Sequence, residues 1–276
     1  MLTCKEYSDL IKKQISEEVK QFEKKPKLVA IQFGDDPSCI SYAKGREKDC
    51  VAVGFILETI KFPENIDNET VLRKIAEMNA DDSINGIILQ QPFPKLFDKK
   101  SIQNAISPEK DVDGFNINSS FEACTPLGVI NYLEYHDYKF ESKSACVVGR
   151  SEVVGKPLAK MLLDRNCTVT VCHSKSHRAD LLNGTFWSDL VFTCVNHIET
   201  FDEDCFGERC DIIDFGIGIG EDGKLHGNIK NHALQELYKT NRDKYGKFVI
   251  SGTGGTGLLT RVALLQNVLK AYKLQS

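Results

Sequence analysis

Long apolar runs are missing from this sequence of 276 residues. A helix that spans a membrane needs roughly 18 or more consecutive apolar residues, and no stretch of the chain reaches that length. The first residues, "MLTCKEYSDLIKKQISEEVKQ", carry charges throughout, which does not fit a signal peptide. The sequence therefore predicts a cytoplasmic protein with no membrane partner.

A large excess of one charge is missing as well. The chain has 35 Lys and Arg against 39 Asp and Glu, so its formal net charge is only −4. Proteins that bind nucleic acid or anionic membranes usually carry a basic patch or stripe. The balanced composition therefore argues against a nucleic-acid partner.

Cysteine and histidine are present, but not in metal-binding spacings. The ten cysteines form no CxxC pair, and Cys146, Cys172 and Cys194 lie inside apolar runs. Such a pattern predicts reduced thiols in the protein core. No metal site is predicted, and five of the six histidines are expected on the surface or in loops. These are His136, His177, His197, His226 and His232.

Short apolar strands alternate with helical patterns along the chain. Helices are expected after Ser38, over 68–80, and from Thr125 and Pro126 onward. Continuous apolar strands separated by helices are typical of parallel sheets that are buried on both faces. Since the strands form two groups around a break near 113–126, the sequence predicts an α/β fold with two lobes. The strands are expected at 27–33, 55–62, 84–91, 144–149, 168–173, 188–195, 210–217 and 247–251.

The stretch "VVGRSEVVGKPLAKMLL" contains an informative turn. A strand ends at Val148, Gly149 and Gly155 flank a short loop, and a helix follows. Glycines at such a junction let the backbone approach a phosphate, and the helix N-terminus offers unpaired N–H groups. A plain tight turn would give a similar pattern, because the spacing is not that of GxGxxG.

The next strand favours the phosphate-binding interpretation. It ends in "CHSKSHR", where an NAD-binding unit would usually place Asp or Glu against the ribose 2′-hydroxyl. The chain instead has Ser174, Lys175 and Arg178, and Arg150 directly follows the first glycine. Cationic and hydroxyl groups without a carboxylate suit a 2′-phosphate. The residues therefore predict an NADP site.

Motifs along the whole chain resemble those of the bifunctional methylenetetrahydrofolate dehydrogenase/methenyltetrahydrofolate cyclohydrolase family. The motifs are "GDDPS...Y", "LQQPFP", "PEKDVDGFN", "CTPLG", "VVGRSEVVGKP", "CHSK", "IIDFGI" and "DGKLHG". The resemblance implies a folate-binding catalytic lobe at 1–118, completed by a helix at 257–276, and a Rossmann-like NADP-binding lobe at 119–256. It also implies NADP-dependent oxidation of methylenetetrahydrofolate, hydrolysis of the methenyl product to formyltetrahydrofolate, and a homodimer.

Several site residues follow from the resemblance, position by position. Tyr42 matches the tyrosine that stacks near the pterin, and Gln90 matches the glutamine that hydrogen-bonds to the catalytic group. Asp113 matches the carboxylate that binds the amino edge of the pterin. Each also has an ordinary structural explanation, as a half-buried tyrosine, a strand-end residue and a turn acid. The expected cofactor contacts are Gly149, Arg150, Ser151, Gly155, His173, Ser174 and Ile217.

Arg46 stands where similar enzymes carry their catalytic lysine. It lies four residues after Tyr42, so both residues share one face of the expected helix. A buried lysine can lose its proton and act as a base, whereas arginine stays protonated. We therefore expect an impaired cyclohydrolase step and some remaining dehydrogenase activity.

Further departures from the family lie near the C-terminus. The family's proline-rich loop stands here as "ISGTGGTGLLT" at 250–260, which predicts a looser loop. The usual Gly-Asp-Val stands as Gly227-Asn228-Ile229. Two alternatives stay open: a non-catalytic relative that binds folate or NADP, and a different two-lobe NADP dehydrogenase, such as one acting on a shikimate-like hydroxy acid.

Overall fold

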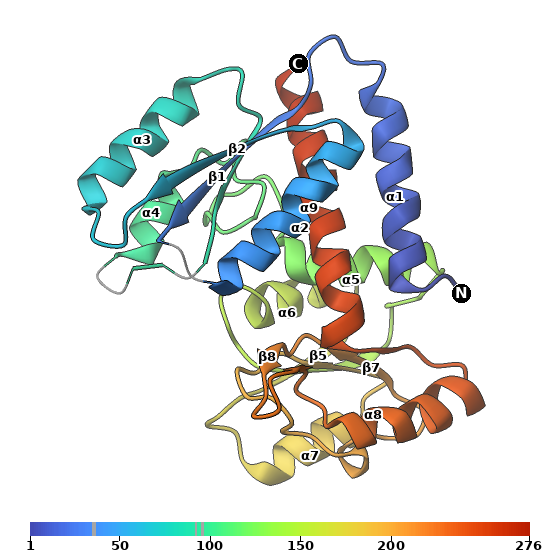
Figure 1. Ribbon diagram of the computed structural model, residues 1–276. Coiled ribbons are helices and arrows are strands. Elements are labelled where there is room, and N and C mark those ends of the chain that lie inside the picture. Colours follow the sequence, from blue (N-terminus) through green and yellow to red (C-terminus); the bar gives the residue numbers. More distant parts are fainter. Residues whose placement is uncertain (35–36, 92, 95–96) are drawn as a thin grey trace. The chain divides into compact units, whose positions relative to one another are not determined.

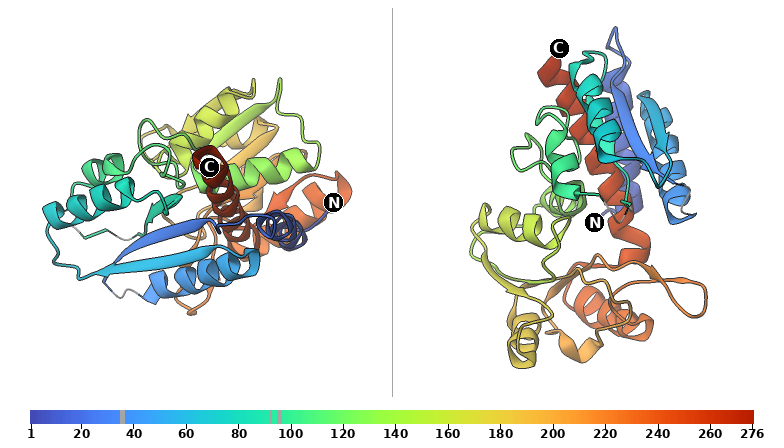
Figure 2. Two further views of the ribbon diagram at one scale, coloured as in Figure 1. Left: turned by 90° about the horizontal axis from the view of Figure 1, so that it is seen from above. Right: turned by 90° about the vertical axis from the view of Figure 1, so that its left-hand side faces the viewer.

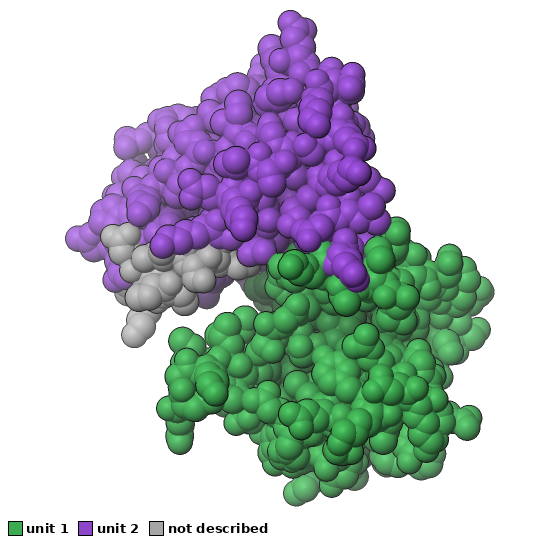
Figure 3. Space-filling view, turned by 45° about the vertical axis from the view of Figure 1, so that its right-hand side comes forward, with its two compact units in different colours: residues 1–5, 125–260 green, residues 6–124, 261–276 purple. Residues whose placement is uncertain are grey.

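The computed structural model of the chain (Figures 1 and 2) describes residues 1–34, 37–91, 93–94 and 97–276, and only the backbone of 37–42. The chain divides into two compact units, which Figure 3 colours separately. One unit consists of residues 6–124 and 261–276, and the other of residues 1–5 and 125–260. Each unit contains a parallel sheet.

A three-stranded parallel sheet forms the centre of the unit built from residues 6–124 and 261–276. Its elements are α1 (Cys4–Val19), β1 (Lys27–Phe33), α2 (Pro37–Val53), β2 (Ile56–Phe62), α3 (Asn68–Ala80), β3 (Gly86–Leu89), α4 (Lys99–Ala105) and α9 (Gly257–Gln275). The strand order is β2-β1-β3. Alternate side chains of β1, namely Val29, Ile31 and Phe33, pack with α3 and α4 in one apolar core. Figure 2 shows α2 on the opposite face of the sheet.

The C-terminal helix α9 contacts segments of this unit that are far away in the sequence. Asn267 donates a hydrogen bond to the Val112 carbonyl oxygen at 2.9 Å, across 155 positions. Gln275 donates to the Asn85 carbonyl oxygen at 3.1 Å, across 190 positions. Because these bonds connect α9 to backbone groups of residues far away in the sequence, α9 is an integral part of the unit.

A five-stranded parallel sheet forms the centre of the other unit. Its order is β10-β7-β6-β4-β5, as expected for a Rossmann-like lobe. The strands are β4 (Ser144–Val148), β5 (Thr168–Cys172), β6 (Leu190–Thr193), β7 (Asp211–Asp214) and β10 (Val249–Ile250), and β8 (Gly218–Ile219) and β9 (Leu225–His226) form a separate hairpin. The helical segments are α5 (Cys124–Tyr135), α6 (Gly155–Leu163), α7 (Arg178–Trp187), η1 (Glu203–Cys205), α8 (Asn231–Leu237), η2 (Tyr238–Lys244) and η3 (Gly252–Thr256).

Two strands differ from the expectation that all of them are buried. β2 and β5 lie at sheet edges, and most of their side chains are exposed or half-buried. An edge strand has a neighbour on one side only, so its burial depends on the elements that cover it, and the edge strands β3 and β10 are buried. The expected burial is therefore wrong for these two strands, although both strands are present.

The helix expected to begin after Thr125 starts slightly earlier. α5 begins at Cys124, so Thr125 and Pro126 lie in its first turn instead of serving as cap and first residue. Proline is tolerated there, because the first four N–H groups of a helix have no intrahelical partner.

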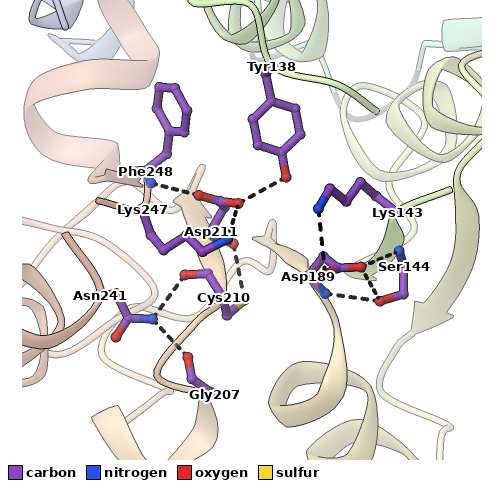
Figure 4. A network of polar contacts seen from close by, with 10 residues as sticks. All are labelled: Tyr138, Lys143, Ser144, Asp189, Gly207, Cys210, Asp211, Asn241, Lys247 and Phe248. Atoms are coloured by element: carbon purple, nitrogen blue, oxygen red, sulfur yellow. Dashed lines mark hydrogen bonds and ion pairs between the residues drawn. The ribbon is translucent and has the colours of Figure 1, made fainter. Parts of the chain in front are cut away.

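Polar contacts gather around the N-terminal ends of strands in the five-stranded sheet (Figure 4). Asp211, at the start of β7, accepts hydrogen bonds from the Tyr138 hydroxyl at 3.0 Å and from the Phe248 N–H at 2.8 Å. Burial raises the pKa of both Asp211 and Tyr138. Ser144 donates from both its N–H and its hydroxyl to Asp189, at 2.9 and 3.0 Å. These bonds link β7 to the segments that precede β4 and β10, and β4 to the segment that precedes β6.

The described cysteines are free thiols, and most of them are buried. Cys146, Cys172 and Cys210 belong to the apolar core of the five-stranded unit. Burial raises the pKa of the Cys194 thiol to about 12, so this group remains protonated at neutral pH. The expectation of core thiols is confirmed for Cys146 and Cys172, whereas Cys194 is half-buried. Among the helices of the described ranges, none is both long enough and apolar enough to cross a membrane.

Candidate active site

Arg46 and Gln90 meet inside the three-stranded unit. Arg46 lies on α2 and is 2% exposed, and its Nη2 donates to Gln90 Oε1 at 2.8 Å. Gln90 directly follows β3, and its N–H donates to the Ile31 carbonyl oxygen at 2.8 Å. This bond continues the pairing of β1 with β3 and fixes the backbone that carries the amide side chain. The structure therefore brings two of the predicted site residues into direct contact.

Asp113 lies close enough to Arg46 for their charges to interact. Removal from water raises the pKa of Asp113 to about 7, and the neighbouring Asp111 carboxylate adds to this rise. The Arg46 guanidinium and a hydrogen bond with the Cys124 thiol act in the opposite direction. A carboxyl group with this pKa changes its charge near neutral pH, which suits a group that binds or releases a proton.

The loop that carries Asp113 depends on a glycine and on two residues, Cys124 and Asn267, that were not predicted as site residues. Gly114 has a φ of +74°, and a Cβ there would lie 2.6 Å from the Glu122 carbonyl carbon. The Cys124 thiol donates to the Val112 carbonyl oxygen at 3.1 Å, and Asn267 donates to the same oxygen. Only the fold brings these residues together, so local spacing gave no signal for Cys124 or Asn267.

Tyr42 lies on α2, but its side chain is outside the described residues. Helical spacing places it one turn before Arg46. The candidate active site therefore consists of Arg46, Gln90 and Asp113, with Tyr42 as a fourth member from the sequence alone. It joins one cation, one amide and one carboxyl group whose pKa lies near neutrality.

The predicted cofactor loop joins β4 to α6. Gly149 has a φ of +134°, and a Cβ there would lie 2.3 Å from the Cys194 carbonyl oxygen. A Cβ on Gly155 would lie 2.4 Å from the Gly149 carbonyl oxygen, so both positions require glycine. The Ser151 hydroxyl accepts from the N–H groups of Val154 and Gly155, at 3.1 and 3.3 Å. A compact loop at a helix N-terminus fits a dinucleotide phosphate.

The side chains predicted to select the cofactor are accessible. Arg150 and Ser174 are exposed, and Ser174 follows β5, the strand next to β4. The His173 N–H donates to Ser176 Oγ at 3.0 Å, and His173 Nδ1 accepts from the Lys175 N–H at 3.2 Å. These bonds form a tight turn after β5 that leaves the Ser174 side chain in solvent.

Ile217 follows β7 and is 63% exposed. The loop before it is held by Asp214, which is fully buried and accepts from the Gly216 N–H at 2.7 Å and the Ile229 N–H at 3.1 Å. Asn228, which the sequence resemblance places where an aspartate is usual, donates to the Val195 carbonyl oxygen at 2.9 Å and accepts from the Val195 N–H at 3.1 Å. An amide can both donate and accept, so this departure adds bonds that a carboxylate would not form.

One histidine differs from the expected surface location. His226, in β9, is 7% exposed, with its ring nitrogens 2.8 Å from Asp222 Oδ1 and 3.1 Å from Glu199 Oε1. The hydrogen bond with Asp222 raises the pKa of His226. Elsewhere, potential ligand atoms of Asp202, Glu203 and His232 lie within 4.8 Å of one another. Lys230 forms an ion pair with Asp202, which supplies the positive charge at that cluster.

Fold and site define a two-unit α/β protein with a dinucleotide-type loop in one unit and an Arg–Gln–Asp group in the other. Two family models match the chain: the catalytic domain of tetrahydrofolate dehydrogenase/cyclohydrolase over residues 2–113, and its NAD(P)-binding domain over residues 123–276. The chain belongs to the tetrahydrofolate dehydrogenase/cyclohydrolase family.

Individual relatives agree with this assignment. The bifunctional protein FolD of Oceanobacillus iheyensis is 35% identical over 285 residues, which cover 99% of this chain and 96% of that protein. The solved bifunctional FolD of Campylobacter jejuni is 32% identical with a TM-score of 0.90, covering 98% of this chain and 97% of that one. The Trypanosoma brucei FolD, solved with NADP and an inhibitor, has a TM-score of 0.86 at 24% identity, covering 99% and 97%, and shows the fold alone.

Several predictions from the sequence are therefore confirmed. They are the family, the α/β fold with a Rossmann-like lobe, the enzymatic character in tetrahydrofolate metabolism, and a nicotinamide cofactor of the NAD(P) type. The family match also excludes the alternative of a dehydrogenase for a shikimate-like acid. The roles of individual site residues and the lobe limits at 118 and 256 stay predictions.

Proposed function

We propose that this protein is an NADP-dependent methylenetetrahydrofolate dehydrogenase whose methenyltetrahydrofolate cyclohydrolase step is slowed by Arg46. The observation that carries the proposal is the buried contact between Arg46 Nη2 and Gln90 Oε1 at 2.8 Å, with Asp113 close by. In this proposal the folate lobe comprises residues 1–118 and 257–276, and the cofactor lobe comprises residues 119–256.

Arg46 binds and orients, but it does not accept a proton. Its guanidinium stays protonated, because arginine does not lose its proton in proteins even when it is buried. The contact with Gln90 fixes the amide, and the positive charge favours the ionised form of Asp113. Asp113 then binds the amino edge of the pterin through two hydrogen bonds, and Tyr42 stacks near the pterin. The fixed positive charge of Arg46 disfavours formation of the cationic methenyltetrahydrofolate. Because arginine replaces the lysine base, no base at position 46 assists the hydrolysis of this product.

The chain's own residues also explain a preference for NADP. NADP, when bound, accepts the hydride from the folate. Gly149, Ser151 and Gly155 would hold its phosphates, while Arg150 and Ser174 would contact the 2′-phosphate, since both are exposed. His173 and Ile217 would line the ends of the cofactor. No carboxylate follows β5 at 173–178 to bind a free ribose 2′-hydroxyl.

We also propose a cytoplasmic homodimer that pairs through the cofactor lobe. In the described part of the chain, β5 is an edge strand with a paired strand on one side only, and Val171 on this strand is 40% exposed. On the neighbouring helices, Leu163 of α6 is 58% exposed and Trp187 of α7 is 76% exposed. Exposed apolar side chains beside a free strand edge favour association of two copies.

The test is a spectrophotometric assay of the purified protein with methylenetetrahydrofolate and either NADP or NAD. We expect reduction of NADP, much slower reduction of NAD, and slow loss of methenyltetrahydrofolate in a separate assay. Binding of folate and NADP without turnover of either cofactor would instead identify a non-catalytic binding protein.

A further inference from the structure

The turn of α2 that carries Arg46 contacts a second cation, Arg261 of α9. Nε of Arg261 lies 2.8 Å from Oδ2 of Asp49, which is three residues beyond Arg46 on α2. Asp49 is 6% exposed, and its Oδ1 lies 3.4 Å from Nζ of Lys12 on α1. A carboxylate this deeply buried depends on its charged partners, because removing one of them leaves a charge that water does not stabilise.

Arg261 also lies against the backbone of α2 at Gly45, the residue directly before Arg46. A Cβ on Gly45 would lie 2.1 Å from Nη1 of Arg261 and 3.1 Å from its Cζ. The guanidinium therefore fills the space that a side chain at position 45 would need. Glycine in a helix interior is less favourable than alanine, so α2 loses some helix stability at this position and gains the contact with Arg261.

We infer that Arg261 is a positioning residue for Arg46, an inference that rests on the proposed function. One side chain contacts residues 45 and 49, which lie on either side of Arg46, and so fixes the rotation of this turn about the helix axis. A rotation of about 10° moves a head group about 6 Å from the axis by roughly 1 Å. Such a shift would break the 2.8 Å contact between Arg46 and Gln90. A misplacement of about 1 Å can reduce a rate by about a hundredfold.

A double-mutant cycle with Gly45→Ala and Arg261→Ala tests the contact through stability. Helix propensity alone predicts that Gly45→Ala raises the folding equilibrium constant by about fivefold. In the starting protein we expect a smaller gain, because the new methyl group makes the guanidinium shift away from Asp49. The full gain should appear only when residue 261 is already alanine. The measurement is the free energy of unfolding, by chemical denaturation, of the starting protein, the two single variants and the double variant. If Gly45→Ala stabilises the starting protein and Arg261→Ala equally, the proposed contact is wrong.

Turnover separates positioning from a purely structural role. For the folded Gly45→Ala and Arg261→Ala variants, we expect kcat with methylenetetrahydrofolate to fall about tenfold or more, while KM for NADP stays the same. Arg261→Lys should recover part of kcat, since lysine keeps the charge but not the planar guanidinium. The matched control is Lys74→Ala, which breaks an exposed ion pair of 3.0 Å with Glu77 and should leave kcat unchanged. Lower stability with unchanged kcat would overturn the inference.

A third measurement does not need turnover. In NMR spectra of protein labelled with ¹⁵N-arginine, the Nε–Hε signal of Arg46 can be identified by its loss in Arg46→Lys. This signal should move in Gly45→Ala and Arg261→Ala and stay in place in Lys74→Ala. If the starting protein reduces neither cofactor, the proposed function fails, whereas an unmoved Arg46 signal would contradict the positioning role.

Discussion

Replacing Arg46 by lysine should accelerate the hydrolysis of methenyltetrahydrofolate. The side chain at position 46 is 2% exposed, and burial lowers the pKa of a lysine ammonium group. A lysine there can release its proton and then take one from the attacking water, which arginine cannot do. A well-placed general base contributes about 10²- to 10⁴-fold in rate. We expect the lower end, about 10²-fold, because lysine must re-form the 2.8 Å contact with Gln90 from a shorter side chain.

The assay follows the loss of methenyltetrahydrofolate absorbance for the starting protein, Arg46→Lys and Arg46→Ala. Arg73→Lys is the matched control, because Arg73 is exposed on α3 of the same unit. Arg46→Ala removes a charge-assisted hydrogen bond that contributes about 1.5–3 kcal/mol. It also lets the pKa of Asp113 rise above about 7, because the Arg46 charge normally lowers it. The reasoning is refuted if the starting protein hydrolyses the substrate at an ordinary enzymatic rate and both changes leave that rate unaltered.

Three further predictions concern the cofactor, the pH and the glycine-rich loop. Arg150→Ala should weaken the binding of NADP about tenfold or more and the binding of NAD much less, because only NADP offers a 2′-phosphate to the guanidinium. Equal kcat/KM for both cofactors in the starting protein would contradict this prediction. Asp113, whose pKa rises from 3.8 to about 7, holds a proton that the unfolded chain releases, so its contribution to stability falls as the pH rises between these values. We therefore expect urea unfolding at about pH 5 and about pH 8 to show that the free energy of unfolding of Asp113→Asn, relative to that of the starting protein, is higher at about pH 8. The same difference at both pH values would argue against the raised pKa. Hydrogen exchange at 250–258 should slow when folate and NADP bind together, and unchanged exchange despite confirmed binding would show that the loop is already rigid or lies outside the site.

Secondary structure could be predicted well wherever an apolar run ends at clear turn residues. The expected strand at 27–33 and the expected helix at 68–80 have the same bounds as β1 and α3. The exposure of β2 and β5 could not be predicted, because it depends on the order of strands in each sheet and on which elements cover each edge strand. His226 was predicted on the surface but is buried, because the fold brings Asp222 and Glu199 to its ring. The sequence around His226 does not show this arrangement.

The candidate site could be predicted only in part. Arg46, Gln90 and Asp113 were found through motifs, and the structure adds the contact between the first two. Arg261 and Asn267 were missed because they lie more than a hundred positions away from the residues they contact. The hydrogen bond of Asn267 to Val112 spans 155 positions, and no local spacing encodes a partner at that distance. Only the packing of α9 beside earlier segments places these side chains.

The discontinuous unit also sets an order of events during synthesis on the ribosome. Residues 6–124 emerge first, but the unit needs residues 261–276, which follow 136 residues later, since 125–260 lie in between. At roughly 5–20 residues per second, the early segment waits about 7–27 s for its last helix. During that time Asn267 and Gln275 are not yet available to Val112 and Asn85. The nascent N-terminal half is therefore the part of this protein most exposed to chaperones and to aggregation, whereas residues 125–260 can complete their own sheet first.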